Sequence, residues 1–132
     1  MMRAVLADTG PLYAAADEDD IHHEHAILQL QKLAKDRREV AIAYPTLLEA
    51  YGLLLFRMGT AAALKWLAFM DAAVLVNPTQ EDYGEALRRV RGLPDQRITL
   101  VDATVGALAS RMGLQVWTYD HHFDVMRVPV WR

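Results

Sequence analysis

Cysteine is absent from the sequence. Its absence excludes disulfides, thiol nucleophiles and zinc sites built on thiolate, and it fits a reducing compartment. Long apolar runs are missing as well, because no uncharged stretch reaches the roughly 18 residues that a membrane span needs. The apolar run Val5–Ala7 is too short for a signal-peptide core before Asp8 interrupts it. We therefore expect a cytoplasmic protein that does not associate with membranes.

An excess of positive charge is also lacking, since the formal net charge is -3. This balance argues against a nucleic-acid binder with a uniformly basic surface. If bound metal neutralised four carboxylates, however, the formal charge of the rest would rise from -3 to +1 and would not repel RNA. Basic residues gather in two clusters, Lys32, Lys35, Arg37 and Arg38, and Arg88, Arg89, Arg91 and Arg97. Contact with phosphate and simple solvation are equally open for both clusters.

What the sequence does contain is a set of short apolar segments that alternate with helical patterns. With 132 residues and 53% apolar side chains, we expect residues 1–132 to form one domain with its own core. Strands are predicted at residues 3–7, 40–43, 74–76 and 115–118, with a short fifth at 128–130. Helices are predicted after residues 8–11, from the acids at 17–20 to about 36, and at 46–57, 61–70, 79–91 and 99–111. This alternation predicts an α/β fold of three layers, with a central, mostly parallel sheet of four to five strands flanked by helices.

Two acids stand directly behind predicted strands. Asp8 follows the first strand, and Asp120 follows the apolar segment that begins at Val116. In an open parallel sheet, ligands bind beyond the carboxyl ends of the strands, near the point where the strand order reverses. The sequence therefore places both aspartates at a candidate binding crevice.

Two further acids lie within apolar helical stretches. Glu49 and Asp102 are each one turn into a predicted helix, among core-forming residues where an unpaired charge is costly. A structural role stays open for all four acids. Thr99 and Asp102 match a capping box, Asp8 and Asp120 could cap the helices that follow them, and an arginine or helix N–H groups could satisfy Glu49.

Four motifs, taken in order, resemble the successive motifs of PIN domains, and most closely those of the VapC-type toxins of toxin–antitoxin pairs. They are Asp8-Thr9-Gly10, Pro45-x-x-x-Glu49, Thr99-Leu100-Val101-Asp102-Ala103 and Thr118-Tyr119-Asp120-His121-His122-Phe123. Each motif alone is weak, but together they span nearly the whole chain. The resemblance implies a PIN-like fold and a metal-dependent endoribonuclease, with RNA as substrate, a VapB-like antitoxin as partner and a homodimer as the assembly.

The same resemblance assigns roles to residues. Asp8, Glu49, Asp102 and Asp120 would be the catalytic, metal-binding acids, Thr9 and Thr118 supporting residues, and Asp124 an outer acid for which a helix-surface role is equally open. Oxygen ligands suit Mg²⁺ or Mn²⁺ better than zinc, and a metal-bound water would be the nucleophile. Whether one or two ions act stays open. We also expect mutual repulsion to raise some of the carboxylate pKa values, so that metal binding releases protons.

Several other residues are interpreted conservatively. His22, His23 and His25 are interpreted as an exposed helix start, and either of His121 and His122 could touch RNA or only solvent. Apolar side chains of the middle helices are expected to form core or a dimer surface rather than a base-stacking platform: Leu53, Leu54, Phe56, Trp66, Phe69 and Met70.

The sequence leaves two alternative functions to consider. A phosphoryl-transfer or receiver domain is disfavoured, because the segment after Asp8 lacks a second aspartate and no lysine follows the late strands. A non-catalytic PIN-like module that holds RNA or a partner without cutting is the main alternative, and the intact set of acids argues against it.

Overall fold

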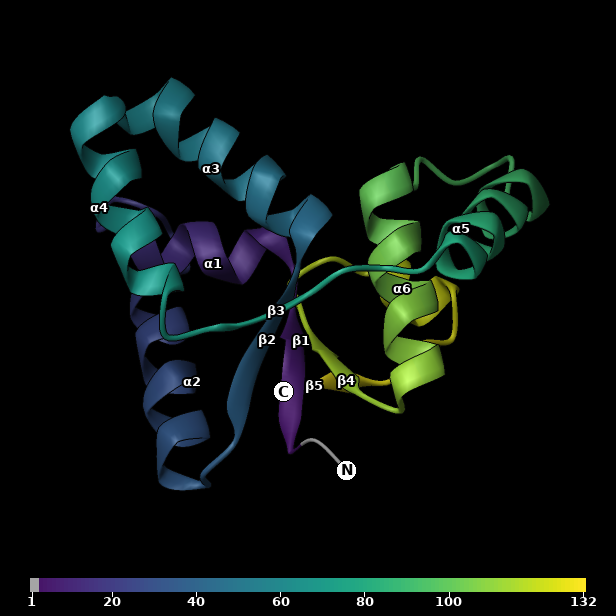
Figure 1. The fold of residues 1–132 in the computed structure, drawn as a ribbon, viewed down its shortest axis with the longest axis horizontal. Helices are drawn as coiled ribbons and strands as arrows, with labels where there is room; N and C mark the ends of the chain where they lie inside the picture. Colours follow the sequence, from purple (N-terminus) through teal and green to yellow (C-terminus); the bar gives the residue numbers. More distant parts are fainter. Residues whose placement is uncertain (1–2) are drawn as a thin grey trace.

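A five-stranded sheet forms the centre of the computed structural model, which describes residues 3–132 (Figure 1). The strands are β1 (Ala4–Ala7), β2 (Glu39–Ala43), β3 (Val74–Val76), β4 (Gln115–Trp117) and β5 (Val130–Trp131). Their order is β3-β2-β1-β4-β5, and every neighbouring pair is parallel. The predicted sheet is thus confirmed, with the larger of the two strand counts, although β5 begins two residues later than predicted.

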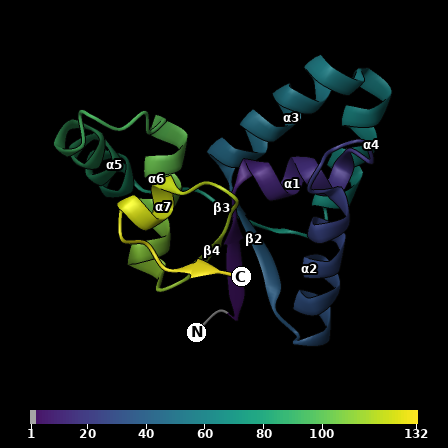
Figure 2. The same cartoon turned by 180° about the vertical axis from the view of Figure 1, so that it is seen from behind.

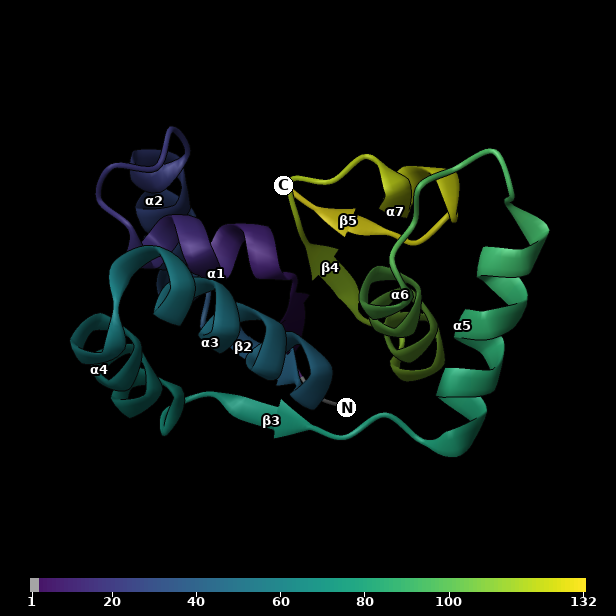
Figure 3. The same ribbon diagram turned by 90° about the horizontal axis from the view of Figure 1, so that it is seen from above.

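Helices cover both faces of this sheet, as views from the front and from behind show (Figures 1 and 2). They are α1 (Thr9–Ala16), α2 (His23–Lys35), α3 (Tyr44–Met58), α4 (Thr60–Met70), α5 (Gln80–Gly92), α6 (Leu100–Met112) and α7 (His122–Val125). Helices α1 to α4 lie on one side and α5 to α7 on the other, which confirms the three layers (Figure 3). Within residues 3–132, no helix is long and apolar enough to cross a lipid bilayer.

Strand β1 is buried on both faces. Because successive side chains of a strand point to opposite sides, Val5 and Ala7 pack with the cluster under α1 to α4, whereas Ala4 and Leu6 pack with the cluster under α6. A strand buried on both faces must be apolar at every position, which explains why β1 shows no alternation. The chain runs outward from β1 through β2 to β3, and then returns to β4 on the other side. The carboxyl ends of β1 and β4 therefore form the crevice where the strand order reverses.

The start of α2 differs from the prediction. The acids between Asp17 and Asp20 were expected to cap this helix, but it begins only at His23. The carboxylates of Asp17 and Asp20 instead accept the N–H groups of Asp19 and His22, at 3.0 and 2.8 Å. Short aspartate side chains compete in this way for nearby backbone donors and so favour turns over helix.

Helices α5 and α6 are joined by an ion pair between a buried aspartate, Asp82, and a half-exposed arginine, Arg111. Asp82 and Thr79 form a complete capping box at the start of α5, in which each side chain accepts the other residue's N–H. Both oxygens of Asp82 also accept hydrogen bonds from Arg111 of α6, at 2.8 and 2.9 Å. The Asp82 side chain is only 3% exposed. Hydrogen bonding from Arg111 holds the pKa of Asp82 below its usual value, although burial opposes this.

We predict that Asp82→Ala lowers the free energy of unfolding by about 2 kcal/mol, because it removes a helix cap and the buried partner of the half-exposed Arg111. Glu85 pairs with Arg88 and Arg89 on the exposed surface of the same helix, so Glu85→Gln is the matched control and should change stability little. Urea denaturation of both variants measures the difference. Equal losses in the two variants would contradict the structural role of Asp82.

Candidate active site

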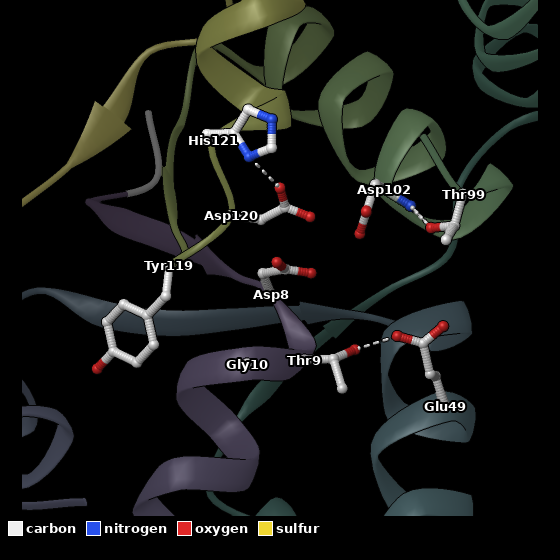
Figure 4. Close-up of a pocket in the computed structure, with 9 residues that line it drawn as sticks. All are labelled: Asp8, Thr9, Gly10, Glu49, Thr99, Asp102, Tyr119, Asp120 and His121. Atoms are coloured by element: carbon white, nitrogen blue, oxygen red, sulfur yellow. Dashed lines mark hydrogen bonds and ion pairs between the residues drawn. The ribbon is translucent and has the colours of Figure 1, made fainter. Parts of the chain in front are cut away.

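A pocket of about 440 Å³ lies at the carboxyl ends of β1 and β4 (Figure 4). Its lining consists of Asp8, Thr9, Gly10, Glu49, Thr99, Asp102, Tyr119, Asp120 and His121. All four acids singled out in the sequence are among them. They come from four separate segments: the end of β1, the second turn of α3, the first turn of α6 and the loop after β4. No lysine or arginine is among these nine lining residues.

Asp8 is the most deeply buried of the four acids, with 4% exposure. Its Oδ2 accepts a hydrogen bond from the Thr118 hydroxyl at 2.8 Å. Its Oδ1 is buried and has no hydrogen-bond partner among the described residues. Although Asp8 stands at the N-cap of α1, its side chain makes no capping bond. Burial raises the pKa of Asp8 to about 6, against the Thr118 hydrogen bond, which lowers it. Capping therefore does not account for this residue.

Asp102 forms only half of the predicted capping box. Its N–H donates to the Thr99 hydroxyl at 3.1 Å, but no return bond to its carboxylate is found in the described chain, in contrast to Asp82. The carboxylate instead faces the pocket (Figure 4). Burial is the largest cause that raises the pKa of Asp102 to about 7, followed by repulsion from Asp8 and Asp120. Asp82 completes the cap of α5, whereas the carboxylate of Asp102, at the same position of α6, is not used for capping and can take another role.

Glu49 does not lie among core residues, as the sequence had suggested, but is exposed on α3. Its Oε1 accepts a hydrogen bond from the Thr9 hydroxyl at 2.7 Å, so a threonine, rather than an arginine or helix N–H groups, orients it. The corresponding contact of Thr118 is with Asp8. Each threonine expected to support the site therefore donates its hydroxyl hydrogen bond to one of the acids.

Asp120 is half-buried and lies between the other acids and two histidines. Its N–H donates to the Thr118 hydroxyl at 2.9 Å, so that this hydroxyl links Asp8 to Asp120. Its Oδ1 accepts the N–H of His122 at 2.9 Å. Burial acts to raise the pKa of Asp120, but the His122 N–H and the hydrogen bond with Asp102 leave it below its usual value. The pKa of Asp120 is therefore shifted in the opposite direction to those of Asp8 and Asp102.

The pKa values of two carboxylates of the pocket are raised, as expected, but for a different main reason. Mutual repulsion contributes, but burial is the largest reason for the raised pKa values of Asp8 and Asp102. A buried oxygen without a partner, beside three more carboxylates and no lysine or arginine among the lining residues, fits a divalent cation bound through oxygen. Among the described residues, no three of the acids bring their oxygens within 4.8 Å of one another.

Other residues singled out in the sequence lie outside the pocket. Asp124 is exposed on α7 and pairs with Arg132 at 3.0 Å, which is the helix-surface role left open for it. Arg38 donates to the carbonyl of Ala4 at the amino end of β1, whereas the pocket lies at the carboxyl end of this strand. The first basic cluster therefore lies away from the acids. In the second cluster, Arg88 and Arg89 bind Glu85.

Tyr119 lines the pocket and was not singled out in the sequence. Its hydroxyl donates to Gln29 at 2.6 Å, and its ring lies 5.0 Å from that of His22 and 5.8 Å from that of His25. The position of Tyr119 at the end of a strand, next to Asp120, was the signal that could have found it. The contact with α2 could not be read from the sequence.

Three solved structures share this fold. VapC20 of Mycobacterium tuberculosis, described as a sarcin-ricin loop cleaving toxin, is 22% identical, with a TM-score of 0.84 over 98% of this chain and 99% of that one. VapBC2 of Rickettsia felis, bound to a DNA fragment from its promoter, is 16% identical, with a TM-score of 0.77 over 98% and 97%. FitAcB of Neisseria gonorrhoeae is 16% identical, with a TM-score of 0.70 over 97% and 96%. At these identities the likeness shows a shared fold.

No curated protein matches this sequence. The PIN domain model, in contrast, matches residues 5–129, which include all four acids of the pocket. Because this match covers nearly the whole chain, in agreement with the fold, the protein belongs to the PIN domain family.

Proposed function

We propose that residues 1–132 form a single nuclease domain that hydrolyses RNA phosphodiester bonds with Mg²⁺ or Mn²⁺. The observation that carries the proposal is the buried, unpartnered Oδ1 of Asp8 in a pocket with three other acids. A carboxylate is kept in such a position at a cost to stability, and a bound cation would offset that cost. Membership of the PIN family supports the same reaction.

In this mechanism, Asp8, Glu49, Asp102 and Asp120 would hold the cation. When bound, the cation supplies an activated water and neutralises the charge that develops on the phosphodiester. The Thr118 hydroxyl orients Asp8 and the loop of Asp120, and the Thr9 hydroxyl orients Glu49. Because the pKa values of Asp8 and Asp102 are raised to about 6 and about 7, these two carboxyls must lose their protons before they can bind a cation.

The biological role that we propose is that of a toxin paired with a VapB-like antitoxin. The similar folds of VapC20, VapBC2 and FitAcB support this role. Helices α3 and α4 also carry exposed apolar side chains that a partner could cover. This α3–α4 surface consists of Leu48, Leu55, Phe56, Leu64 and Phe69, of which Phe56 is 88% exposed. We propose that it contributes to a homodimer.

Asp8→Asn and Asp102→Asn should each abolish metal-dependent RNA cleavage, because each removes a charged ligand from the pocket. Asp124→Asn removes an exposed acid outside the pocket and should cut at the wild-type rate. A panel of structured RNAs incubated with Mg²⁺ or Mn²⁺ provides the assay. Cleavage by both pocket variants at the wild-type rate, in preparations free of contaminating nuclease, would refute the assignment. RNA binding by the wild type without cuts would favour the non-catalytic module.

The stability of the metal-free protein should fall as the pH rises from about 4 to about 7. Because the pKa of Asp8 is raised from 3.8 to about 6, its contribution is fully present below 3.8 and is lost as the pH passes 6. That shift corresponds to about 3 kcal/mol. Asp102, with a pKa of about 7, acts in the same direction. Urea denaturation in EDTA across this range should show the fall in the wild type.

The fall should be smaller in Asp8→Asn, because asparagine carries no charge at any pH in this range. Mg²⁺ or Mn²⁺ added at about pH 8 should restore stability to the wild type more than to this variant. An identical dependence on pH in the wild type and in Asp8→Asn would contradict the raised pKa.

If the α3–α4 surface forms the homodimer interface, Phe56→Asp or Phe69→Asp should yield a monomer, because the new carboxylate would lose its water when the interface forms. Ile21 is 91% exposed in the turn before α2, so Ile21→Asp is the matched control and should leave the assembly unchanged. Light scattering coupled to size-exclusion chromatography measures the mass. A monomeric wild type would end the dimer proposal.

A further inference from the structure

We propose that Asp120, His121 and His122 form a second metal site, which binds a Zn²⁺-class ion at the rim of the acidic pocket. The site differs from the oxygen-lined pocket in its ligands, although Asp120 and His121 also line that pocket. Of the residues that the structure describes, these three form the one group of histidine and acidic side chains whose ligand atoms all lie within 4.8 Å of one another.

The distances fit a small ion. Asp120 Oδ1 lies 3.6 Å from His121 Nδ1 and 3.0 Å from His122 Nδ1. Two ligand atoms of a tetrahedral ion with bonds of roughly 2.0–2.1 Å are about 3.3 Å apart. The observed distances lie on either side of this value, so small rotations of the side chains would place both nitrogens and the oxygen around one ion.

An unsatisfied nitrogen provides the second, independent observation. His122 Nδ1 is buried and makes no hydrogen bond, although Asp120 Oδ1 is only 3.0 Å away. That oxygen instead accepts the backbone N–H of His122. A buried nitrogen without a partner is uncommon and costs stability, and coordination would satisfy it. His121 is 75% exposed and lies with its ring 4.3 Å from that of His122, so it can complete the site without disturbing the core.

The ligand set selects the type of ion. One carboxylate oxygen with two imidazole nitrogens suits Zn²⁺, Co²⁺ or Ni²⁺, whereas Mg²⁺ prefers oxygen throughout. Figure 4 shows one oxygen of Asp120 directed at His121 and the other at the acids of the pocket. An ion held by the histidines would therefore draw Asp120 away from Asp102. Inhibition of cleavage by Zn²⁺ follows from this geometry, and this consequence alone rests on the proposed nuclease function.

Titration with Co²⁺ and Zn²⁺ tests the site in protein without a histidine tag. The parent should be Asp8→Asn, in which the acidic pocket is disabled. It should bind one Co²⁺ with the visible absorption of a four- or five-coordinate ion, and with the same affinity as the wild type. His121→Ala and His122→Ala in this background should weaken binding by about tenfold or more. His25→Ala removes an exposed histidine outside the group and should have no effect.

The exposed position of His121 makes it the decisive variant, because its replacement leaves the core intact even if His122→Ala fails to fold. Undiminished affinity in His121→Ala, an equal loss in His25→Ala, or loss of binding on going from wild type to Asp8→Asn would each overturn the proposed site. In cleavage assays with Mg²⁺, Zn²⁺ should inhibit the wild type more strongly than His121→Ala. Co²⁺ binding without cleavage by any variant would refute the nuclease and leave the site standing.

Discussion

The parallel pairing of β1 with β4 is the constraint on which the rest of the structure depends. It places Asp8 and Thr118 next to each other at the carboxyl ends of two adjacent strands, where the Thr118 hydroxyl donates to Asp8 and accepts from the Asp120 N–H. One hydroxyl thereby joins two acids that are more than a hundred residues apart in the chain. Since β1 is buried on both faces, its end cannot move to relieve the burial of Asp8. The raised pKa of Asp8 is therefore a consequence of the sheet.

Two copies of one local pattern show how tertiary contacts decide the use of a side chain. Thr79 with Asp82 and Thr99 with Asp102 have the same spacing and stand at the same helix position. In the first pair the aspartate completes the cap and binds Arg111, and its pKa is lowered. In the second pair, Asp102 has no arginine partner but is buried next to other acids, and its pKa is raised to about 7. The difference lies entirely in what the rest of the chain brings near each carboxylate.

Asp120 connects two environments of different chemistry. On one side Asp120 faces the carboxylate oxygens of the pocket, and on the other it faces the imidazole nitrogens of His121 and His122. Hard oxygen ligands and borderline nitrogen ligands select different ions, so a single carboxylate between them can take part in either set. Its lowered pKa, in contrast to those of Asp8 and Asp102, means that it offers a charged oxygen to both.

Much of the fold and of the candidate site could be predicted from the sequence alone. Apolar periodicity and the turns between segments determined the α/β class and the alternation of strands and helices, because these signals are local. The positions of Asp8 and Asp120 at strand ends were predictable for the same reason. The partners of each side chain were not, since Thr9 meets Glu49 and Tyr119 meets Gln29 only after distant segments pack. Tertiary structure alone decided that Glu49 is exposed and that Asp102 leaves its cap incomplete. It also decided that burial, more than repulsion, raises the carboxylate pKa values. The physical reason is that solvent is excluded by residues that lie far away in the sequence.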